Sequence, residues 1–334
     1  TSFTLFCSMG GCGGTGLGIG RSPPMTDASA PAASSDAPRR ALHASIRRVA
    51  IVVNPLSGGV GPQAAAEAEA ILSLYDCDPT VTTLEGARIG DQITEALDAK
   101  PDVLFVLAGD GTARSVAARA GMKGPLIAPL PGGTMNMLPK ALYGTADWKA
   151  ALRRALDEGE PMVVAGGVVE GEAFYCAAIL GSPALWAPAR EAMRTGKLKL
   201  AWMYGRRALK RAFTGRLRYS LDGGDKRRAE ALVLISPLIS KAMVKCDGLE
   251  AAAMNPSDAA QAFRLAAHAL FDDWRHDPNV TTRPARWIGV AARSKIPAVI
   301  DGEPMLLGRE AAVTFQPRAF RALVPRPPAG EDSL

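Results

Sequence analysis

The sequence predicts an α/β protein in which a doubly wound parallel sheet is followed by an antiparallel β domain. The first observation is a set of three apolar runs without polar alternation, beginning at Arg48, Val103 and Leu126, as is typical of strands buried on both faces of a parallel sheet. The second is that stretches of helical composition alternate with strand-like segments as far as about residue 161. The third is that this alternation stops after Pro161, where strand-like segments follow one another. Together these observations predict an α/β domain over residues 45–161 and a β domain over residues 162–313.

In the first domain each strand is expected to lead into a helix. The run that starts at Arg48 is followed by an alanine- and glutamate-rich segment, 62–74, and the β-branched segment 79–83 predicts a second strand. Further helices are predicted over residues 89–97, 113–120, 137–142 and 148–156, with Asp147 available to cap the last one. This βαβ rhythm predicts a parallel sheet covered by helices.

In the second domain the predicted strands are short and carry no helices between most of them. They cover residues 162–169, 173–180, 217–221, 229–236, 249–254, 285–292 and 297–300. A hairpin turn is expected at 222–225, which reads Asp-Gly-Gly-Asp. Residues 256–274 form the one long amphipathic helix predicted here. The composition therefore predicts an antiparallel β domain with an inserted helix.

The first 44 residues are predicted to be a disordered leader. They are rich in glycine, proline, alanine and serine and show no hydrophobic periodicity. The glycine-rich stretch 14–20 superficially matches a dinucleotide-binding loop, but no predicted strand precedes it and no predicted helix follows. We therefore reject that interpretation.

Composition limits the classes of protein to which the chain can belong. No apolar stretch reaches the roughly 18 to 20 residues that a membrane-spanning helix needs, so no transmembrane segment is expected. The five cysteines are odd in number and lack the spacing of a metal site, which favours unpaired thiols in a reducing, cytoplasmic compartment. The three histidines form no cluster either.

The net charge of +6 is unevenly distributed along the chain. No acidic residue occurs between Glu191 and Asp222, and the window 194–218 interleaves arginines and lysines with Trp202 and Tyr204. One interpretation is a basic amphipathic helix that lies on an anionic membrane surface. The other is a helix that packs on the core and exposes a solvated basic face. Nucleic acid is not expected as a partner, because no recognition motif is present.

Each buried run of the first domain ends in glycines and small polar side chains. The three ends read Asn-Pro-Leu-Ser-Gly-Gly over residues 54–59, Gly-Asp-Gly-Thr over 109–112 and Pro-Gly-Gly-Thr-Met-Asn over 131–136. The carboxyl ends of parallel strands meet at the ligand-binding edge of a sheet, and glycines let backbone N–H groups approach a phosphate closely. Ordinary turn chemistry is the alternative for any one of these loops, but three converging loops predict a phosphate-binding site. Asp110 is the single carboxylate in the three loops and is best placed to hold Mg²⁺ at the phosphates.

A second candidate group of catalytic residues is Asp301-Gly302-Glu303, near the end of the predicted β domain. In an extended segment, residues two apart face the same way, so both carboxylates are expected on one face. Two carboxylates so close together tend to raise the pKa of one of them, which suits a general base. A plain hairpin turn is the alternative.

The order and wording of these motifs resemble the diacylglycerol kinase catalytic family, which includes bacterial lipid kinases and shares its domain with sphingosine and ceramide kinases. The resemblance rests on the Asn-Pro-x-Ser-Gly loop, the Gly-Asp-Gly-Thr turn, the Gly-Thr-x-Asn turn and the Asp-Gly-Glu segment, and it runs from about residue 47 to about residue 325. The sequence departs from the family at Ala108, where a glycine is usual. A methyl group there is expected to narrow the approach of the backbone to phosphate without abolishing it.

The resemblance implies a β-sandwich for the second domain, whose last strand returns to the first domain at residues 314–327, and an active site in the cleft between the domains. It implies ATP and Mg²⁺ as cofactors and Glu303 as the proton acceptor, with Asp301 and Asp110 as further catalytic residues. It also implies a structural magnesium at Asp247, although Cys246 stands where the family has a first aspartate. The expected nucleotide-binding residues are Asn54, Pro55, Ser57, Gly58, Thr83, Gly109, Asp110, Gly111, Thr112, Thr134 and Asn136.

The predicted function is therefore ATP-dependent phosphorylation of a primary hydroxyl of a lipid, either diacylglycerol-like or sphingoid- or ceramide-like. The enzyme is expected to be cytoplasmic and to reach its lipid peripherally through the basic window 194–218, with homodimer formation left open. A soluble-substrate kinase of the same superfamily, such as an NAD kinase or a phosphofructokinase, is the first alternative. A catalytically inactive module that binds nucleotide or lipid is the second.

Overall fold

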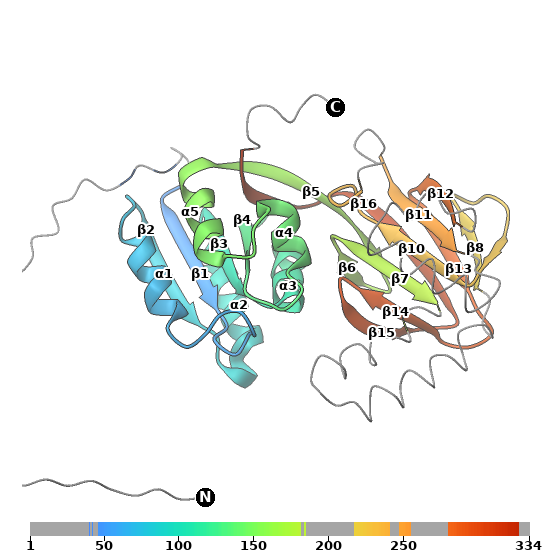
Figure 1. Ribbon diagram of the computed structural model, residues 1–334, viewed down its shortest axis with the longest axis horizontal. Helices are drawn as coiled ribbons and strands as arrows, with labels where there is room; N and C mark the ends of the chain where they lie inside the picture. Colours follow the sequence, from blue (N-terminus) through green and yellow to red (C-terminus); the bar gives the residue numbers. More distant parts are fainter. Residues whose placement is uncertain are drawn as a thin grey trace, which may run out of the picture. The chain divides into compact units, whose positions relative to one another are not determined.

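The computed structural model describes residues 40, 42, 46–181, 184, 217–240, 247–254 and 280–326 (Figure 1). All of them lie within one compact unit, Arg39–Leu334. The predicted helix 256–274 and most of the basic window, residues 194–216, lie outside the described residues.

The N-terminal part is built on four parallel strands in the order β2-β1-β3-β4. They are β1 (Arg48–Val53), β2 (Asp78–Thr83), β3 (Val103–Ala108) and β4 (Leu126–Pro131). Every residue of β3 and β4 is buried, as their unbroken apolar sequences predict. From β1 the chain runs to β2 at one edge of the sheet and then returns past β1 to β3. This path gives the strand order of a doubly wound sheet.

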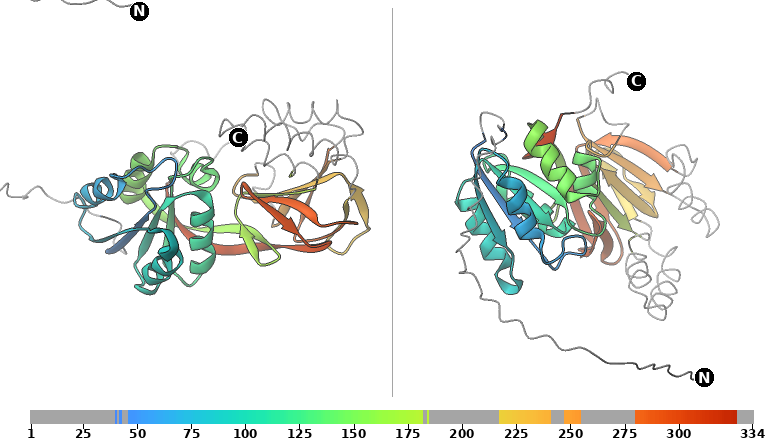
Figure 2. Two further views of the ribbon diagram at one scale, coloured as in Figure 1. Left: turned by 90° about the horizontal axis from the view of Figure 1, so that it is seen from below. Right: turned by 60° about the vertical axis from the view of Figure 1, so that its left-hand side comes forward.

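Helices cover both faces of these strands (Figure 2). Right-handed crossovers in opposite directions put the helix after β1 and the helix after β2 on opposite faces. On one face, Lys149 of α5 pairs with Glu67 of α1, with 2.7 Å between Nζ and Oε1. On the other, Arg119 of α3 donates to Thr94 of α2 at 3.3 Å. The helices are α1 (Ala64–Leu72), α2 (Ile89–Asp98), α3 (Asp110–Ala120), α4 (Met137–Tyr143) and α5 (Trp148–Glu158), with a short 3-10 turn, η1 (Gly86–Arg88), before α2.

Helix boundaries differ from the predicted ones mainly at α3. The sequence predicted a turn at 109–112 and a helix from 113, whereas α3 already begins at Asp110 with Gly109 as its N-cap. The Gly-Asp-Gly-Thr segment is therefore the first turn of a helix rather than a loop before it. At α5 the predicted cap is confirmed, because the carboxylate of Asp147 accepts from the N–H of Lys149 at 2.9 Å.

The C-terminal part is an antiparallel β-sandwich. One sheet has the order β12-β11-β10-β7-β14-β15, and it packs on β16, β13, β8 and β9, which continue the parallel sheet beyond β4. Side chains from both sheets, such as Leu232, Leu249, Ile288 and Val313, share one buried core. The strands are β5 (Gly159–Val169), β6 (Glu172–Phe174), β7 (Ala177–Gly181), β8 (Leu217–Leu221), β9 (Arg227–Ala229), β10 (Ala231–Ile235), β11 (Leu249–Met254), β12 (Val280–Ala285), β13 (Trp287–Ala291), β14 (Ile296–Ile300), β15 (Glu303–Leu307) and β16 (Glu310–Pro325).

Three segments that the sequence predicted as single strands contain a break, although the segment 285–292 includes only the last residue of β12, whose other residues were not predicted as a strand. The breaks fall at Tyr175 and Cys176, at Glu230 and at Arg286. In each case the chain crosses there from one sheet of the sandwich to the other: β6, β9 and β13 belong to the larger sheet, and β7, β10 and β12 to the smaller. Both halves of each segment face the same core, so the apolar pattern continues through the crossing.

The long strand β16 is shared by the parallel and the antiparallel parts of the molecule. It pairs with β13 and with β5 in antiparallel fashion, and Ala322 lies opposite Ile127 of the parallel strand β4. A β-bulge between Gln316 and Phe320 shifts the register where the strand passes from one part to the other.

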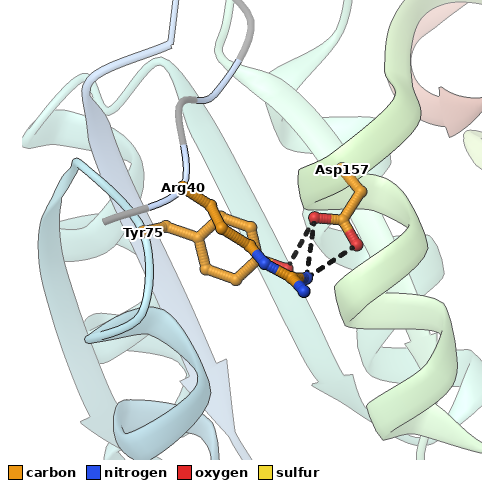
Figure 3. Close-up of polar contacts among 3 residues, drawn as sticks. All are labelled: Arg40, Tyr75 and Asp157. Atoms are coloured by element: carbon orange, nitrogen blue, oxygen red, sulfur yellow. Dashed lines mark hydrogen bonds and ion pairs between the residues drawn. The ribbon is translucent and has the colours of Figure 1, made fainter. Parts of the chain in front are cut away.

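Two residues that the sequence assigned to the leader contact the folded unit. Arg40 forms an isolated bridge with Tyr75, and its guanidinium lies 3.4 Å from a carboxylate oxygen of Asp157. Figure 3 shows Arg40 and Tyr75 both directed at this carboxylate, to which the Tyr75 hydroxyl donates at 2.9 Å. Leu42 packs against the core of the α/β part. The folded unit therefore begins before residue 45.

Among the described residues, no helix has the length and apolarity required to cross a membrane.

Candidate functional site

The three glycine-bearing loops meet at the carboxyl edge of the parallel strands. The N–H of Asn54 donates to the carbonyl of Leu107 at 2.9 Å, and the N–H of Gly59 donates to the carbonyl of Gly132 at 3.1 Å. A Cβ atom placed on Gly58 would lie 3.6 Å from Thr134 Oγ1. The structure thus brings together the loops that the sequence predicted to converge.

Glycine is required at the point where these loops pack most closely. A Cβ atom on Gly132 would lie 2.7 Å from Val60 Cγ2 and 2.9 Å from the backbone N and O of Ala108. On Gly133 it would lie 3.0 Å from the Cα of Gly109. Ala108, which departs from the family pattern, is buried in the core of the α/β part, so its methyl group occupies core volume rather than the surface of the loops.

Asp110 ties the second loop to the third. Its two carboxylate oxygens accept from the N–H groups of Asn136 and Met137, each at 2.9 Å. Asn136 adopts a left-handed conformation with φ 52°, and its side chain accepts from the N–H of Gly133 at 2.7 Å and donates to the carbonyl of Gly133 at 3.0 Å. Both residues therefore shape the loops, in addition to any contact with a ligand.

The remaining predicted nucleotide-binding residues surround this junction. Gly111 and Thr112 lie in the first turn of α3, where unpaired N–H groups and the helix dipole favour an anion. Asn54 holds its loop by accepting from the N–H of Leu56 at 3.1 Å. Thr83 ends β2 opposite Val53 of β1, and its side chain is exposed. The others, half-buried or exposed, are Pro55, Ser57, Gly58, Gly109 and Thr134.

Asp301 and Gly302 form a two-residue hairpin turn between β14 and β15, with φ 45° and 91°. The expectation of an extended segment is wrong here, and the hairpin alternative is right. Because both residues have positive φ, as in a type I′ turn, the two carboxylates do not share a face. The side chain of Asp301 turns inward and is 5% exposed, whereas that of Glu303 is exposed.

Asp301 is held by three backbone N–H groups. Its carboxylate accepts from Tyr175 at 2.7 Å and from Cys176 and Ala177 at 2.9 Å each, where the chain crosses from β6 to β7. Burial raises the pKa of Asp301, and these three hydrogen bonds, together with the cation of Arg114, oppose the rise. The shift in pKa therefore comes from burial and not from repulsion by Glu303.

Glu303 lies against the first turn of α3. A Cβ atom on Gly111 would stand 3.7 Å from Glu303 Oε1, so the carboxylate of the hairpin lies beside the glycine loops. Gly302, between the two acids, lies against the third loop, since its Cβ position is 3.1 Å from the sulfur of Met135. The two groups of residues that the sequence singled out separately thus occupy one site.

Sequence reasoning missed two parts of this site. One is the crossing segment Tyr175–Ala177, which appeared to be the middle of a strand and gave no signal. The other is Arg114, which stands three residues after Gly111 and so lies on the same face of α3. That spacing was available in the sequence.

The side chains at the three loops suit a nucleotide phosphate with one magnesium ion, whereas those at Asp247 do not suit a second metal ion. Carboxylate oxygens offer about four acceptor positions, of which Asp110 uses two, and phosphate-bound Mg²⁺ commonly takes only one or two protein carboxylates. Asp247, by contrast, is exposed and paired with Arg286 at 2.7 Å. Within the described ranges, no group of three or more His, Cys, Asp or Glu side chains could hold a metal ion. A structural magnesium at Asp247 is therefore not supported by these residues.

Comparison with known proteins finds a family model that is similar to part of the chain. Residues 48–166 match the diacylglycerol kinase catalytic domain. Among solved structures, a diacylglycerol kinase from Bacillus anthracis is 16% identical, with a TM-score of 0.61, and the alignment covers 85% of this chain and 99% of that one. A proposed diacylglycerol kinase from the same organism is 18% identical, with a TM-score of 0.64 and the same coverage. No curated protein matches the sequence. The structural likenesses show a common fold.

Proposed function

We propose that the protein, whose residues 48–166 match the diacylglycerol kinase catalytic domain, is a kinase that transfers the terminal phosphoryl group of ATP to a primary hydroxyl of a lipid. The observation that supports this most is the position of Glu303 Oε1, 3.7 Å from the Cβ position of Gly111. It puts a carboxylate beside the loops that would hold the phosphates.

In this proposal the three loops form the phosphate cradle. The N–H groups of the first turn of α3 and the hydroxyls of Ser57 and Thr134 are the donors available to phosphate oxygens. Asp110 keeps free acceptor positions for a magnesium ion, which neutralises phosphate charge when it is bound.

Glu303 is the proposed general base. Its carboxylate accepts the proton of the acceptor hydroxyl while that oxygen bonds to the terminal phosphorus and the bond to the ADP oxygen breaks. Its exposed position leaves room for a substrate hydroxyl, whereas both oxygens of Asp301 already accept from backbone N–H groups. Asp301 is thus better suited to holding the turn that carries Glu303 than to taking the proton itself.

A lipid acceptor is favoured by the Asn-Pro-Leu-Ser-Gly and Gly-Thr-Met-Asn loops and by the naming of the Bacillus anthracis proteins as diacylglycerol kinases. Such an acceptor lies at the headgroup level of a membrane, which the enzyme would have to reach from the cytoplasm. The basic window 194–218 remains the proposed membrane contact on the grounds of its sequence.

Radiolabelled ATP, supplied with Mg²⁺, tests the proposal against a panel of acceptors: diacylglycerol, a sphingoid base, ceramide and phosphatidylglycerol, with NAD and a sugar phosphate as soluble acceptors. We expect label in one lipid class with the wild type and none with Glu303→Gln. Label in NAD or the sugar phosphate instead would identify a soluble-substrate kinase. ATP binding without transfer to any acceptor would identify an inactive module.

A further inference from the structure

The phosphate loops carry no positive side chain of their own. Residues 54–60, 108–113 and 131–137 contain neither lysine nor arginine, although a nucleotide held there would bring several negative charges. The first basic residue after the central loop is Arg114, one turn into α3.

Arg114 is largely buried, with 16% of its side chain exposed. Its Nη2 lies 3.4 Å from Oε2 of Glu172 in β6, so it connects the helix of the phosphate site to the β-sandwich. Its Nη1 is buried and has no hydrogen-bond partner among the described residues. A largely buried guanidinium to which the described residues offer one long ion pair is a costly arrangement for the fold, which suggests that the charge serves another purpose.

The charge of Arg114 acts on the hairpin that carries Glu303, the proposed base. Glu172 begins the short strand β6, and Tyr175 and Cys176, whose N–H groups hold the carboxylate of Asp301, follow directly after that strand. Titratable groups that interact with Asp301 include Tyr175, Cys176 and Arg114, and the charge of Arg114 lowers the pKa of Asp301, while the carboxylate of Asp110 acts on the same Cys176. Protonation would put a hydrogen on one carboxylate oxygen and weaken its acceptance of backbone N–H groups.

We propose that Arg114 is a positioning residue that keeps the Asp301–Gly302 turn, and with it Glu303, in place beside the first turn of α3. It does so through its ion pair with Glu172, in the strand that leads into the crossing segment, and through its charge, which opposes protonation of Asp301. The inference rests on the proposed function, because it assigns Glu303 as the base.

Four single variants test this role in the full chain: Arg114→Met, Arg114→Lys, Glu172→Gln and, as a matched control on the exposed side of the same helix, Arg119→Met. Arg114→Met should lower kcat by up to about 10²-fold, the cost of a misplaced catalytic group, with the KM for ATP changed little. The acidic limb of its kcat–pH profile should move to higher pH, because Asp301 is then protonated more easily. Arg114→Lys and Glu172→Gln keep the cation and should keep the acidic limb of the wild type, and Arg119→Met should match the wild type throughout.

A second readout does not depend on activity. Amide hydrogen exchange at Tyr175, Cys176 and Ala177 should be faster in Arg114→Met than in the wild type, and the difference should be larger at mildly acidic pH than at higher pH. Unchanged exchange, or a fall in kcat with an unmoved acidic limb, would overturn the proposal. If Arg114→Met does not fold, Arg114→Lys decides: a wild-type acidic limb supports the role and a shifted limb refutes it. A wild type without kinase activity would refute the proposed function, while the exchange measurement would still test the hold on Asp301.

Discussion

Asp301 and Glu303 stand two positions apart and have opposite surroundings. Asp301 is buried and satisfied by three backbone N–H groups, while Glu303 is exposed and lies next to Gly111. A carboxylate whose oxygens all have fixed partners stabilises structure, and one that has space beside a phosphate site can exchange a proton. The turn of positive φ between them separates the structural carboxylate from the proposed base.

These surroundings predict opposite effects for the matching amide substitutions. Glu303→Gln should lower kcat by about 10²- to 10⁴-fold, the usual contribution of a general base, and should leave the midpoint of thermal unfolding unchanged. Asp301→Asn places an NH₂ group against backbone N–H groups and should cost about 1–3 kcal/mol of stability, the penalty for unsatisfied buried donors. Thermal unfolding together with a single-turnover assay separates the two. A destabilised Glu303→Gln or an Asp301→Asn variant of full stability would contradict the assignment.

At this scale the sequence predicted which residues lie close together but not their local geometry, and their chemical roles stay predictions. Asp110, Asn136 and Glu303 were found from motif and spacing, and the structure brings all three to the same loops. The error at Asp301 arose because Asp-Gly-Glu is compatible both with an extended segment and with a type I′ turn, and only pairing of β14 with β15 selects the turn. Arg114 was passed over because a single arginine in a helix is usually solvated, and only tertiary packing buries it.

At the scale of elements, the packing of the three loops allows a larger residue at some glycine positions and not at others. A Cβ atom on Gly132 meets backbone atoms of Ala108 at 2.9 Å, which cannot move without disturbing β3. On Gly58 the nearest atom is Thr134 Oγ1 at 3.6 Å, an ordinary contact. Two glycines of one site therefore differ in what they tolerate.

Gly132→Ala should consequently destabilise the fold by about 1–3 kcal/mol, as overpacking does, and lower nucleotide affinity by moving the third loop. Gly58→Ala is the matched control: its stability should stay within about 0.5 kcal/mol of the wild type. Chemical denaturation measures the free energy of unfolding of the two variants. Equal losses of stability in the two variants would show that the loops do not pack as described.

Elements of the parallel part were predicted more completely than those of the sandwich. A βαβ unit is recognised by the alternation of strand-like and helix-like segments, so every strand and α-helix between Arg48 and Glu158 was predicted, and only the short 3-10 turn η1 was missed. In the sandwich, the breaks at Glu230 and Arg286 interrupt no hydrophobic pattern, because the chain only changes sheet and keeps facing the same core. Local sequence contains no information about such a crossing.

For the molecule as a whole, the boundary of the folded unit can be tested by truncation. Arg40 donates its N–H to Leu74 and accepts from the N–H of Asp76, each at 2.9 Å, and Leu42 packs on the core. A chain that begins at Arg39 should unfold at the temperature of the full chain. For a chain that begins at Ser45, the melting temperature should fall by about 2–4 °C for each kcal/mol that these contacts contribute to the free energy of unfolding. Equal melting temperatures for the two truncated chains would mean that the contacts of Arg40 and Leu42 contribute nothing.

The place of β16 in the sheet also governs how the protein can be made. This strand leaves the ribosome after every other described strand, yet it lies inside the larger sheet, between β4 and β13. Until it emerges, β4, β5 and β13 present unpaired backbone groups, the kind of edge that recruits other chains. A translation product that stops short of Glu310 would therefore be a substrate for chaperones and proteases rather than a smaller working enzyme.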